Sequence, residues 1–420
     1  MSASGIRTGE RVRAIVTGLG VVAPTGIGAQ EHWESVVAGK SGLGRITRFD
    51  PSGYPVKIAG EVPGFDTAGQ VPNRLIPQTD RFTHFALAAA GMALADADAD
   101  TTTLPEYEMA VVTASSSGGT EFGQHEMEQL YRKGPSWVGA YQSIAWFYAA
   151  TTGQVSIRHG MRGPCGVLCC EQAGGLDALG QSRRLLGTGS RLVLSGGTDA
   201  SLCPYGLTAQ LSTGALSRQD DPARAYLPFD TEACGYVPGE GGAMLVVESA
   251  ESARQRGVGH YGELRGYASG FDPMAESGRP PVLAVVIRRA LADAGIGPDA
   301  VDVVFADASG VPEQDLAESR AITEVFGPGG VPVTAPKTLT GRLYAGGASL
   351  DVATALLAMA AGVVPHTAGP ATTAPGCEID LVRVEPRPTA PRVALVLARG
   401  HGGFTSALVV GAGGRTTVRL

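Results

Sequence analysis

Apolar runs and helically spaced apolar positions divide the chain into predicted strands and helices. The mostly apolar run from Ala14 to Val22, followed by the chain breaker Pro24, predicts a buried strand. The stretch from Phe82 to Ala97 has apolar residues at helical spacing and predicts a helix. His84 in that helix has no second ligand or catalytic partner nearby in sequence, so we expect it to be a packed or surface histidine.

Two segments that lie roughly 170 residues apart share one order of strand end, small-residue turn and helix. The first runs from Cys169 to Leu179, and the second from Tyr344 to Ala353. Each half also ends in apolar strands, at Gly242 to Val247 in the first half and at Val393 to Leu397 with Ser406 to Val410 in the second. This pattern predicts a duplicated βαβ-type unit in an α/β protein, with halves at residues 12–262 and 263–412.

Composition and charge narrow the class of protein further. The 420 residues are 44% hydrophobic and 17% charged, which is enough for a large core. No run of about 18 uncharged apolar residues predicts a membrane span, and residues 1–13 lack the apolar region of a secretory signal. Six cysteines without paired Cys/His spacing predict reduced thiols in the cytoplasm and no zinc site. A net charge of −7 without a basic run argues against a nucleic-acid partner.

The glycines near the start of the chain superficially suggest a dinucleotide-binding loop. Gly18, Gly20 and Ala23 have the required spacing, but Pro24 follows at once where that motif needs a helix. We therefore expect a turn at the end of the strand and no nucleotide site.

The turn after Val167 to Cys169 resembles the nucleophile elbow of the β-ketoacyl synthases. In that family a cysteine stands at this turn, where the helix N-terminus lowers its pKa and backbone amides form an oxyanion hole. Here the matching position is Gln172. The resemblance covers nearly the whole chain through further segments: Ile15 to Val22, Gly163-Pro164, Pro228-Phe229-Asp230, Gly239-Glu240-Gly241 and Gly400 to Phe404.

The two catalytic histidines of the family are replaced as well. Asp307 stands where the family has the histidine of a His-Gly-Thr-Gly-Thr stretch, and Arg342 stands where a Lys-x-x-x-Gly-His stretch ends. Lys337 of that second stretch is kept, and His401 occupies the usual place of a gating phenylalanine. A carboxamide at Gln172 is no acyl acceptor, and neither an aspartate nor an arginine replaces a neutral imidazole.

This combination is similar to that of the β subunits of type II polyketide ketosynthases, the chain length factors. The resemblance implies the thiolase fold, with two duplicated halves in a five-layer αβαβα arrangement. It also implies a heterodimer with a catalytic ketosynthase α subunit, and an acyl carrier protein that brings malonyl units and carries the polyketide chain. It implies no membrane partner, no cofactor and no metal.

Two interpretations of Gln172 stay open. In one, the side chain fills the vacated cysteine position and hydrogen-bonds the turn. In the other, its carboxamide holds a malonyl thioester carbonyl, and the chain is a malonyl-carrier-protein decarboxylase that supplies the acetyl starter. The neighbouring Cys169 and Cys170 are expected to be buried and inert, because neither stands at the helix start.

The charged residues of the altered site carry their own expectations. We expect Asp307 and Arg342 to pair as ions, because a lone buried charge is costly. Lys337 is expected to bond the backbone or Glu318. The aromatic residues 146–148 fit either a core or the surface of a dimer.

The resemblance also implies a gate for product length. Thr120, Gly123 and Met127 share one face of a helix that borders the product tunnel in chain length factors, and Tyr205 adds a wall. Their small or flexible side chains predict a long product of about ten to twelve acetate units. Alternatively, Gly123 merely allows close helix packing.

Overall fold

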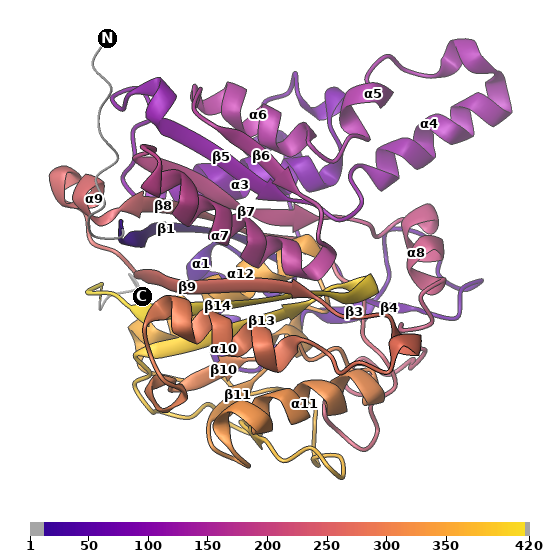
Figure 1. Cartoon of the computed structure of the whole chain (residues 1–420). Coiled ribbons are helices and arrows are strands. Elements are labelled where there is room, and N and C mark those ends of the chain that lie inside the picture. Colours follow the sequence, from indigo (N-terminus) through magenta and orange to yellow (C-terminus); the bar gives the residue numbers. More distant parts are fainter. Residues whose placement is uncertain (1–11, 416–420) are drawn as a thin grey trace.

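The computed structural model describes residues 12–415 and arranges them in five layers of helices and sheet (Figure 1). Residues 1–11, on which much of the expected lack of a secretory signal depends, lie outside the described residues. The layers confirm the predicted thiolase-type arrangement. Among the described residues, no helix is long and apolar enough to cross a membrane.

The strands form two sheet halves that repeat one pattern. The first half has the order β1–β8–β7–β5–β6, and the second half has the order β9–β14–β13–β10–β11–β12. In both halves three neighbouring strands are parallel and are followed by antiparallel strands: β6, β5 and β7 correspond to β11, β10 and β13. The second half adds β12, which pairs parallel with β11. The halves join where β1 pairs antiparallel with β9. This repeat confirms the predicted duplication.

The bounds of the first-half strands are β1 Ala14–Ala23, β5 Met109–Ala114, β6 Cys165–Leu168, β7 Leu192–Asp199 and β8 Gly241–Ser249. Those of the second half are β9 Gly262–Phe271, β10 Val303–Phe305, β11 Pro332–Thr334, β12 Asp380–Leu381, β13 Val393–Arg399 and β14 Phe404–Ala412. Because β9 opens the second pattern, we propose that the halves are residues 12–262 and 263–412.

Two helices fill the central layer between the sheets. They are α7 (Gly174–Gly187) and α12 (Ala345–Ala361), and they contact each other and strands of both halves. The α12 segment is apolar around nearly its whole circumference, as a helix enclosed on all sides must be. The outer layers contain α3 (Arg81–Asp96) and α6 (Ala150–His159) on one side, with α10 (Leu283–Ala294) and α11 (Pro312–Phe326) on the other (Figure 1).

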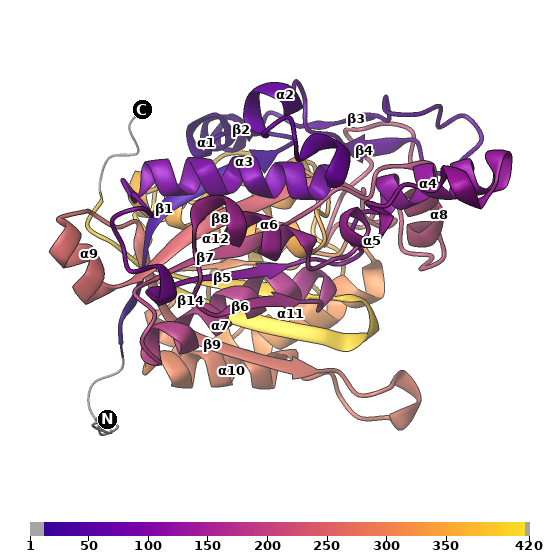
Figure 2. The same ribbon diagram turned by 90° about the horizontal axis from the view of Figure 1, so that it is seen from above.

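One segment projects away from this layered body. It contains α4 (Thr120–Lys133) and α5 (Gln142–Ala145), and both views show it extending beyond the sheets, with α8 (Pro204–Leu211) near its base (Figures 1 and 2). Helix α1 (Ala29–Val37) packs against α12, where His32 lies 2.9 Å from the hydroxyl of Thr354. The other short strands and helices are β2 Gly26–Ile27, β3 Leu43–Arg45, β4 Ile58–Gly60, α2 Thr67–Gln70 and α9 Ala250–Arg256.

The expected turn follows β1 at Pro24 and Thr25, but Gly18 and Gly20 lie inside the strand and are not part of the turn. A Cβ atom at Gly18 would lie 2.1 Å from the carbonyl oxygen of Ala93, and one at Gly20 would lie 1.9 Å from that of Ala89. Both contacts are with α3, so these glycines let the helix pack directly on the strand. No nucleotide is needed to explain their spacing.

We expect Gly20→Ala to lower the free energy of unfolding by about 1–3 kcal/mol, because the added methyl group forces α3 away from β1. The measurement is denaturant unfolding followed by circular dichroism. Gly44→Ala is the matched control, since nothing lies within 4 Å of a Cβ atom at that position of β3. Equal stability of the two variants would show that the close packing of α3 on β1 is not required.

Candidate functional site

The site lies where three loops meet at the carboxyl ends of parallel strands. Gln172 follows β6, Asp307 follows β10, and Arg342 follows β11. The carboxyl ends of parallel strands are the usual place for a site in an α/β fold. The N-termini of α7 and α12 pack closely here, since a Cβ atom at Gly175 would lie 2.7 Å from the backbone nitrogen of Ser349.

Two carboxylates of α11 shape the loop that carries Asp307. Glu318 accepts hydrogen bonds from the backbone nitrogens of Asp307 and Ala308, at 2.7 and 2.8 Å. Asp315 accepts from the backbone nitrogens of Gly310 and Phe229, at 3.0 and 2.9 Å. Burial raises the pKa of Glu318 to about 7, and the nearby charge of Asp307 adds to this rise. The loop is therefore held in place by buried acids of the outer helix.

Asp307 and Arg342 form the expected ion pair. The Arg342 Nη1 and Nη2 atoms lie 3.0 and 3.1 Å from the two carboxylate oxygens of Asp307. The side chains are only 2% and 5% exposed for Asp307 and Arg342, respectively. Burial alone would raise the pKa of Asp307, but the charges of Arg342 and Lys337 and hydrogen bonds hold it below its usual value. Both groups are thus charged at neutral pH.

All five guanidinium donors of Arg342 have acceptors. Besides the carboxylate, Nη1 donates to the backbone oxygen of Asp307 and Nη2 to that of Arg399, each at 3.0 Å. The Gln172 side-chain amide is oriented so that its nitrogen faces an acceptor and its oxygen faces a donor. In this orientation Arg342 Nε donates to Oε1 of Gln172 at 3.0 Å. A buried guanidinium is stabilised when every donor is used in this way.

Gln172 lies at the turn before α7 and is only 4% exposed. Its side-chain nitrogen donates to the backbone oxygen of Tyr344 at 2.9 Å, while its oxygen accepts from Arg342. Gln172, Arg342 and Asp307, which replace the three catalytic residues of the resembled family, are therefore one connected group. The bonds of Gln172 run to the other half of the chain, which corrects the expected bonds to its own turn.

Lys337 forms an ion pair with Asp351, and this corrects the expected bond to Glu318 or the backbone. The Nζ atom lies 2.8 Å from a carboxylate oxygen of Asp351, and both side chains are buried. Asp351 is the one charged residue of α12. A lone acid in an otherwise apolar helix needs a buried cation, so this signal was available in the sequence. By contrast, no sequence pattern indicates that Arg342 donates to the backbone oxygen of Arg399 or that Gln172 donates to that of Tyr344.

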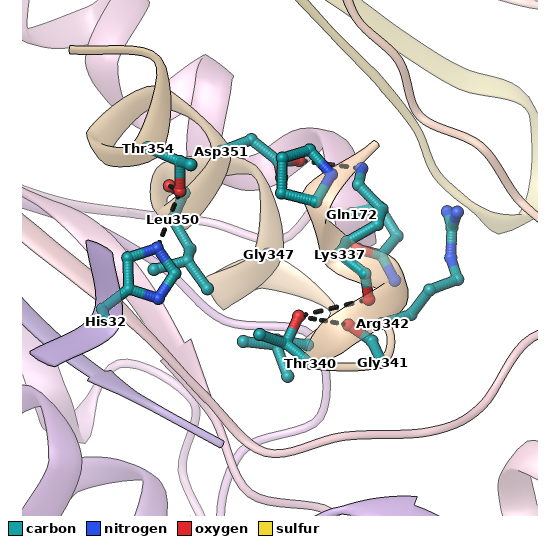
Figure 3. A pocket seen from close by; sticks show the side chains of 12 residues that line it. His32, Gln172, Lys337, Thr340, Gly341, Arg342, Gly347, Leu350, Asp351 and Thr354 are labelled. Carbon is teal, nitrogen blue, oxygen red and sulfur yellow. Dashed lines mark hydrogen bonds and ion pairs between the residues drawn. The ribbon is translucent and has the colours of Figure 1, made fainter. Parts of the chain in front are cut away.

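The space left at the centre of the site is very small. A cavity of about 10 Å³ is lined by His32, Gln172, Lys337, Arg342, Asp351 and Thr354, among others. Figure 3 shows His32 and Thr354 on one side of this cavity and Gln172 and Arg342 on the other. That volume holds about one water molecule. A thioester cannot enter unless these side chains move.

A second pocket opens beside the glycine-rich loop at 400–403. It has a volume of about 160 Å³, and its lining includes Glu171, Arg342, Arg399 and His401. The backbone nitrogen of His401 donates to the carboxylate of Glu171, and the His401 side chain is exposed. Arg342 lines both this pocket and the central cavity.

The cysteines beside the elbow are less buried than expected. The strand β6 ends at Leu168, so Cys169 is exposed and Cys170 is half-buried. Partial burial and the charge of Asp199 raise the pKa of Cys169, and burial with a hydrogen bond to Asp177 raises that of Cys170 to about 12. Both thiols are therefore protonated at neutral pH and are weak nucleophiles.

Of the four residues expected to gate product length, Thr120, Gly123 and Met127 lie in α4, and Tyr205 lies in the first turn of α8. Thr120 and Gly123 are buried, while Met127 is 36% and Tyr205 46% exposed. A Cβ atom at Gly123 would lie 2.8 Å from the Trp146 ring. The space beside Gly123 is thus occupied by an indole of the same chain. This contact favours the alternative interpretation, in which Gly123 allows close packing.

Most of the chain matches one known protein family. Residues 12–253 match the family described as β-ketoacyl synthase, N-terminal domain, and residues 261–370 match its C-terminal domain. The chain belongs to the β-ketoacyl synthase family. Within this family, the chain is 58% identical over 398 residues to the tetracenomycin polyketide synthase ketoacyl synthase β subunit of Streptomyces glaucescens, covering 94% of this chain and 97% of that protein.

Other ketosynthases of polyketide pathways are similar over almost the same span. The actinorhodin polyketide putative β-ketoacyl synthase 2 of Streptomyces coelicolor is 56% identical, covering 94% of this chain and 98% of that protein. Among solved structures, the ishigamide ketosynthase/chain length factor superimposes with a TM-score of 0.87 at 28% identity, covering 96% of this chain and 100% of that one. These similarities confirm the resemblance to ketosynthase β subunits of type II polyketide synthases.

We expect Asp307→Ala and Arg342→Ala each to cost about 3–5 kcal/mol of unfolding free energy, because each leaves the other charge buried without its partner. The double variant should lose much less than the sum of the two single losses. Denaturant unfolding of the four proteins in this cycle measures the coupling.

The surface pair Arg288 and Glu324 is the matched control for this cycle. Its charged atoms lie 2.7 Å apart, but both side chains are about half exposed. Its coupling should stay below about 1 kcal/mol. Strictly additive losses at Asp307 and Arg342 would rule out an energetic link between them.

Proposed function

We propose that this chain is the non-catalytic subunit of a heterodimeric polyketide ketosynthase and sets the length of the product. The observation that carries this proposal is the occupied centre of the site. Gln172, Asp307 and Arg342 fill it with hydrogen-bonded side chains and leave about 10 Å³ of free volume. Condensation then has to take place on an intact α subunit, with acyl chains brought by an acyl carrier protein.

The exposed apolar side chains of the projecting segment support a partner subunit. Trp137, Trp146, Phe147 and Tyr148 are all more than 40% exposed in the single chain. Beside them, β6 is the outer strand of its sheet half, and its residues are only partly covered. Large exposed apolar areas of this kind mark protein interfaces. We assign this face to the α subunit.

The proposed setting is the cytoplasm, with no membrane or nucleic-acid partner. All six cysteines are free thiols, which agrees with a reducing compartment. The net charge of −7 gives no electrostatic reason to bind nucleic acid. No cofactor or metal enters the proposed role.

The alternative function is decarboxylation of malonyl carrier protein at Gln172. Two features of the site weigh against it. The amide nitrogen that would hold the malonyl carbonyl donates to the backbone of Tyr344, and the cavity is too small for a thioester. We therefore assign Gln172 a structural role, with Asp307, Lys337 and Arg342 as the remnants of the catalytic site.

We expect Gln172→Ala, in a purified pair with the α subunit, to leave product length unchanged and to lower initiation only modestly. Elongation does not pass through this side chain. The measurement is mass analysis of the released polyketide, together with carbon dioxide release from malonyl carrier protein by the isolated chain. Complete loss of product from a folded variant pair, or rapid carbon dioxide release that depends on Gln172, would instead establish the decarboxylase.

Product length is assigned to the face of α4 that carries Thr120 and Met127, with Tyr205 beside it. The length of the tunnel limits the product, because each two-carbon unit adds about 2.5 Å to an extended chain. Gly123 provides no room here, so the proposed product of about ten to twelve acetate units now depends on the small Thr120 and the flexible Met127.

Met127→Trp should shorten the product by about one or two acetate units, because the indole extends further into the tunnel than the thioether. Met127 is partly exposed in the single chain, so the variant should fold. His125→Trp is the control, since it is exposed on the opposite face of the same helix. The products are compared by mass. Unchanged length in the Met127 variant would place the gate elsewhere.

A further inference from the structure

A single buried carboxylate joins the N-termini of two helices. Asp80 is 3% exposed, and its Oδ1 atom accepts from the backbone nitrogen of Phe82 at 3.2 Å, which caps its own helix α3. Its Oδ2 atom accepts from the backbone nitrogen of Phe122 in the first turn of α4 at 2.7 Å. One side chain thus serves as the acceptor for both helix ends.

The helix α4 depends on this outside acceptor. The residue that precedes it, Gly119, has no side chain and makes no capping hydrogen bond of its own. A Cβ atom at Gly119 would lie 2.8 Å from the Cβ of Asp80, so the two helix ends are in direct contact. The first backbone amides of a helix need acceptors from elsewhere, and Asp80 supplies one across 42 positions of sequence.

A second contact holds the same turn from the other side. Arg48 donates through Nη2 to both carboxylate oxygens of Glu121, each at 2.6 Å, and through Nε to the backbone oxygen of Leu202 at 3.3 Å. Glu121 is also well placed beside the positive end of the helix dipole. Beyond this anchored turn, α4 projects from the body of the molecule (Figure 1).

We propose that Asp80 is a positioning residue for product length, with Glu121 as a second anchor. This inference rests on the proposed function, in which Met127 of α4 forms part of the tunnel wall. A helix is stiff, so the position of its first turn determines where a side chain five residues later lies. Asp80 touches no substrate in this scheme and acts only through α4.

The test is Asp80→Asn in the purified pair with the α subunit. An asparagine has one side-chain oxygen, so it can accept from only one of the two helices. We expect backbone hydrogen exchange at Phe122 to become about tenfold faster, as for the loss of a helix cap. We also expect one dominant product to become a mixture of neighbouring lengths, measured by mass.

Ser249→Ala is the matched control. Ser249 caps α9 alone, by accepting from the backbone nitrogen of Ser252 at 3.0 Å, and α9 lies at the opposite end of the molecule from α4 (Figure 1). It should lower stability by a similar amount and leave the product distribution unchanged. A mixture of lengths from this variant too would mean that general destabilisation is the cause, and the inference would fail.

Glu121→Ala provides an independent variant if Asp80→Asn does not fold. The Glu121 side chain is partly exposed, so its removal should be tolerated. It should also speed exchange in the first turn of α4 and broaden the product. If neither folded variant changes product length while Met127→Trp does, Asp80 is not a positioning residue and the proposed function stands. If Met127→Trp is without effect as well, the proposed role of α4 itself is wrong.

Discussion

The buried ion pair between Arg342 and Asp307 is the interaction on which the centre of this structure depends. Removing two charges from water is costly, and attraction between them offsets that cost only when the remaining donors and acceptors are also used. Here every guanidinium donor of Arg342 has an acceptor, and these acceptors come from Asp307, Gln172 and the backbone of Arg399. The pair therefore fixes three separate loops at once. A site built in this way leaves about 10 Å³ of free volume, which is too little for an acyl thioester.

The duplicated fold explains why these residues can meet at all. The parallel strands β5, β6 and β7 of one half and β10, β11 and β13 of the other both direct their carboxyl ends toward the central helices. Gln172 enters from the first half, and Asp307 and Arg342 enter from the second. In a catalytic member of the family the same convergence assembles a nucleophile and its two histidines. In this chain the scaffold is kept, and the side chains it brings together stabilise one another.

Much of this could be predicted from the sequence, because strong patterns carried it. The apolar run of β1, the helical spacing of α3, the repeat of strand, turn and helix, and the family motifs led to the correct fold. The ion pair followed from the cost of a lone buried charge. The error at Lys337 was avoidable, because the lone acid of α12 indicated its partner. The contacts that the sequence did not reveal, the Trp146 ring beside Gly123 and the helix packed on Gly20, join segments that local sequence patterns do not bring together.

The most direct test of the closed site is acyl labelling of Gln172→Cys, followed by peptide mapping to separate this thiol from Cys165 and Cys169. The chain is assayed as a pair with the α subunit and loaded carrier protein. We expect no label at position 172, because Arg342 and Asp307 still occupy the centre of the site. Labelling should appear only when both are also replaced by alanine. Acylation of the single variant at a rate similar to that of the α subunit's own cysteine would contradict a closed site.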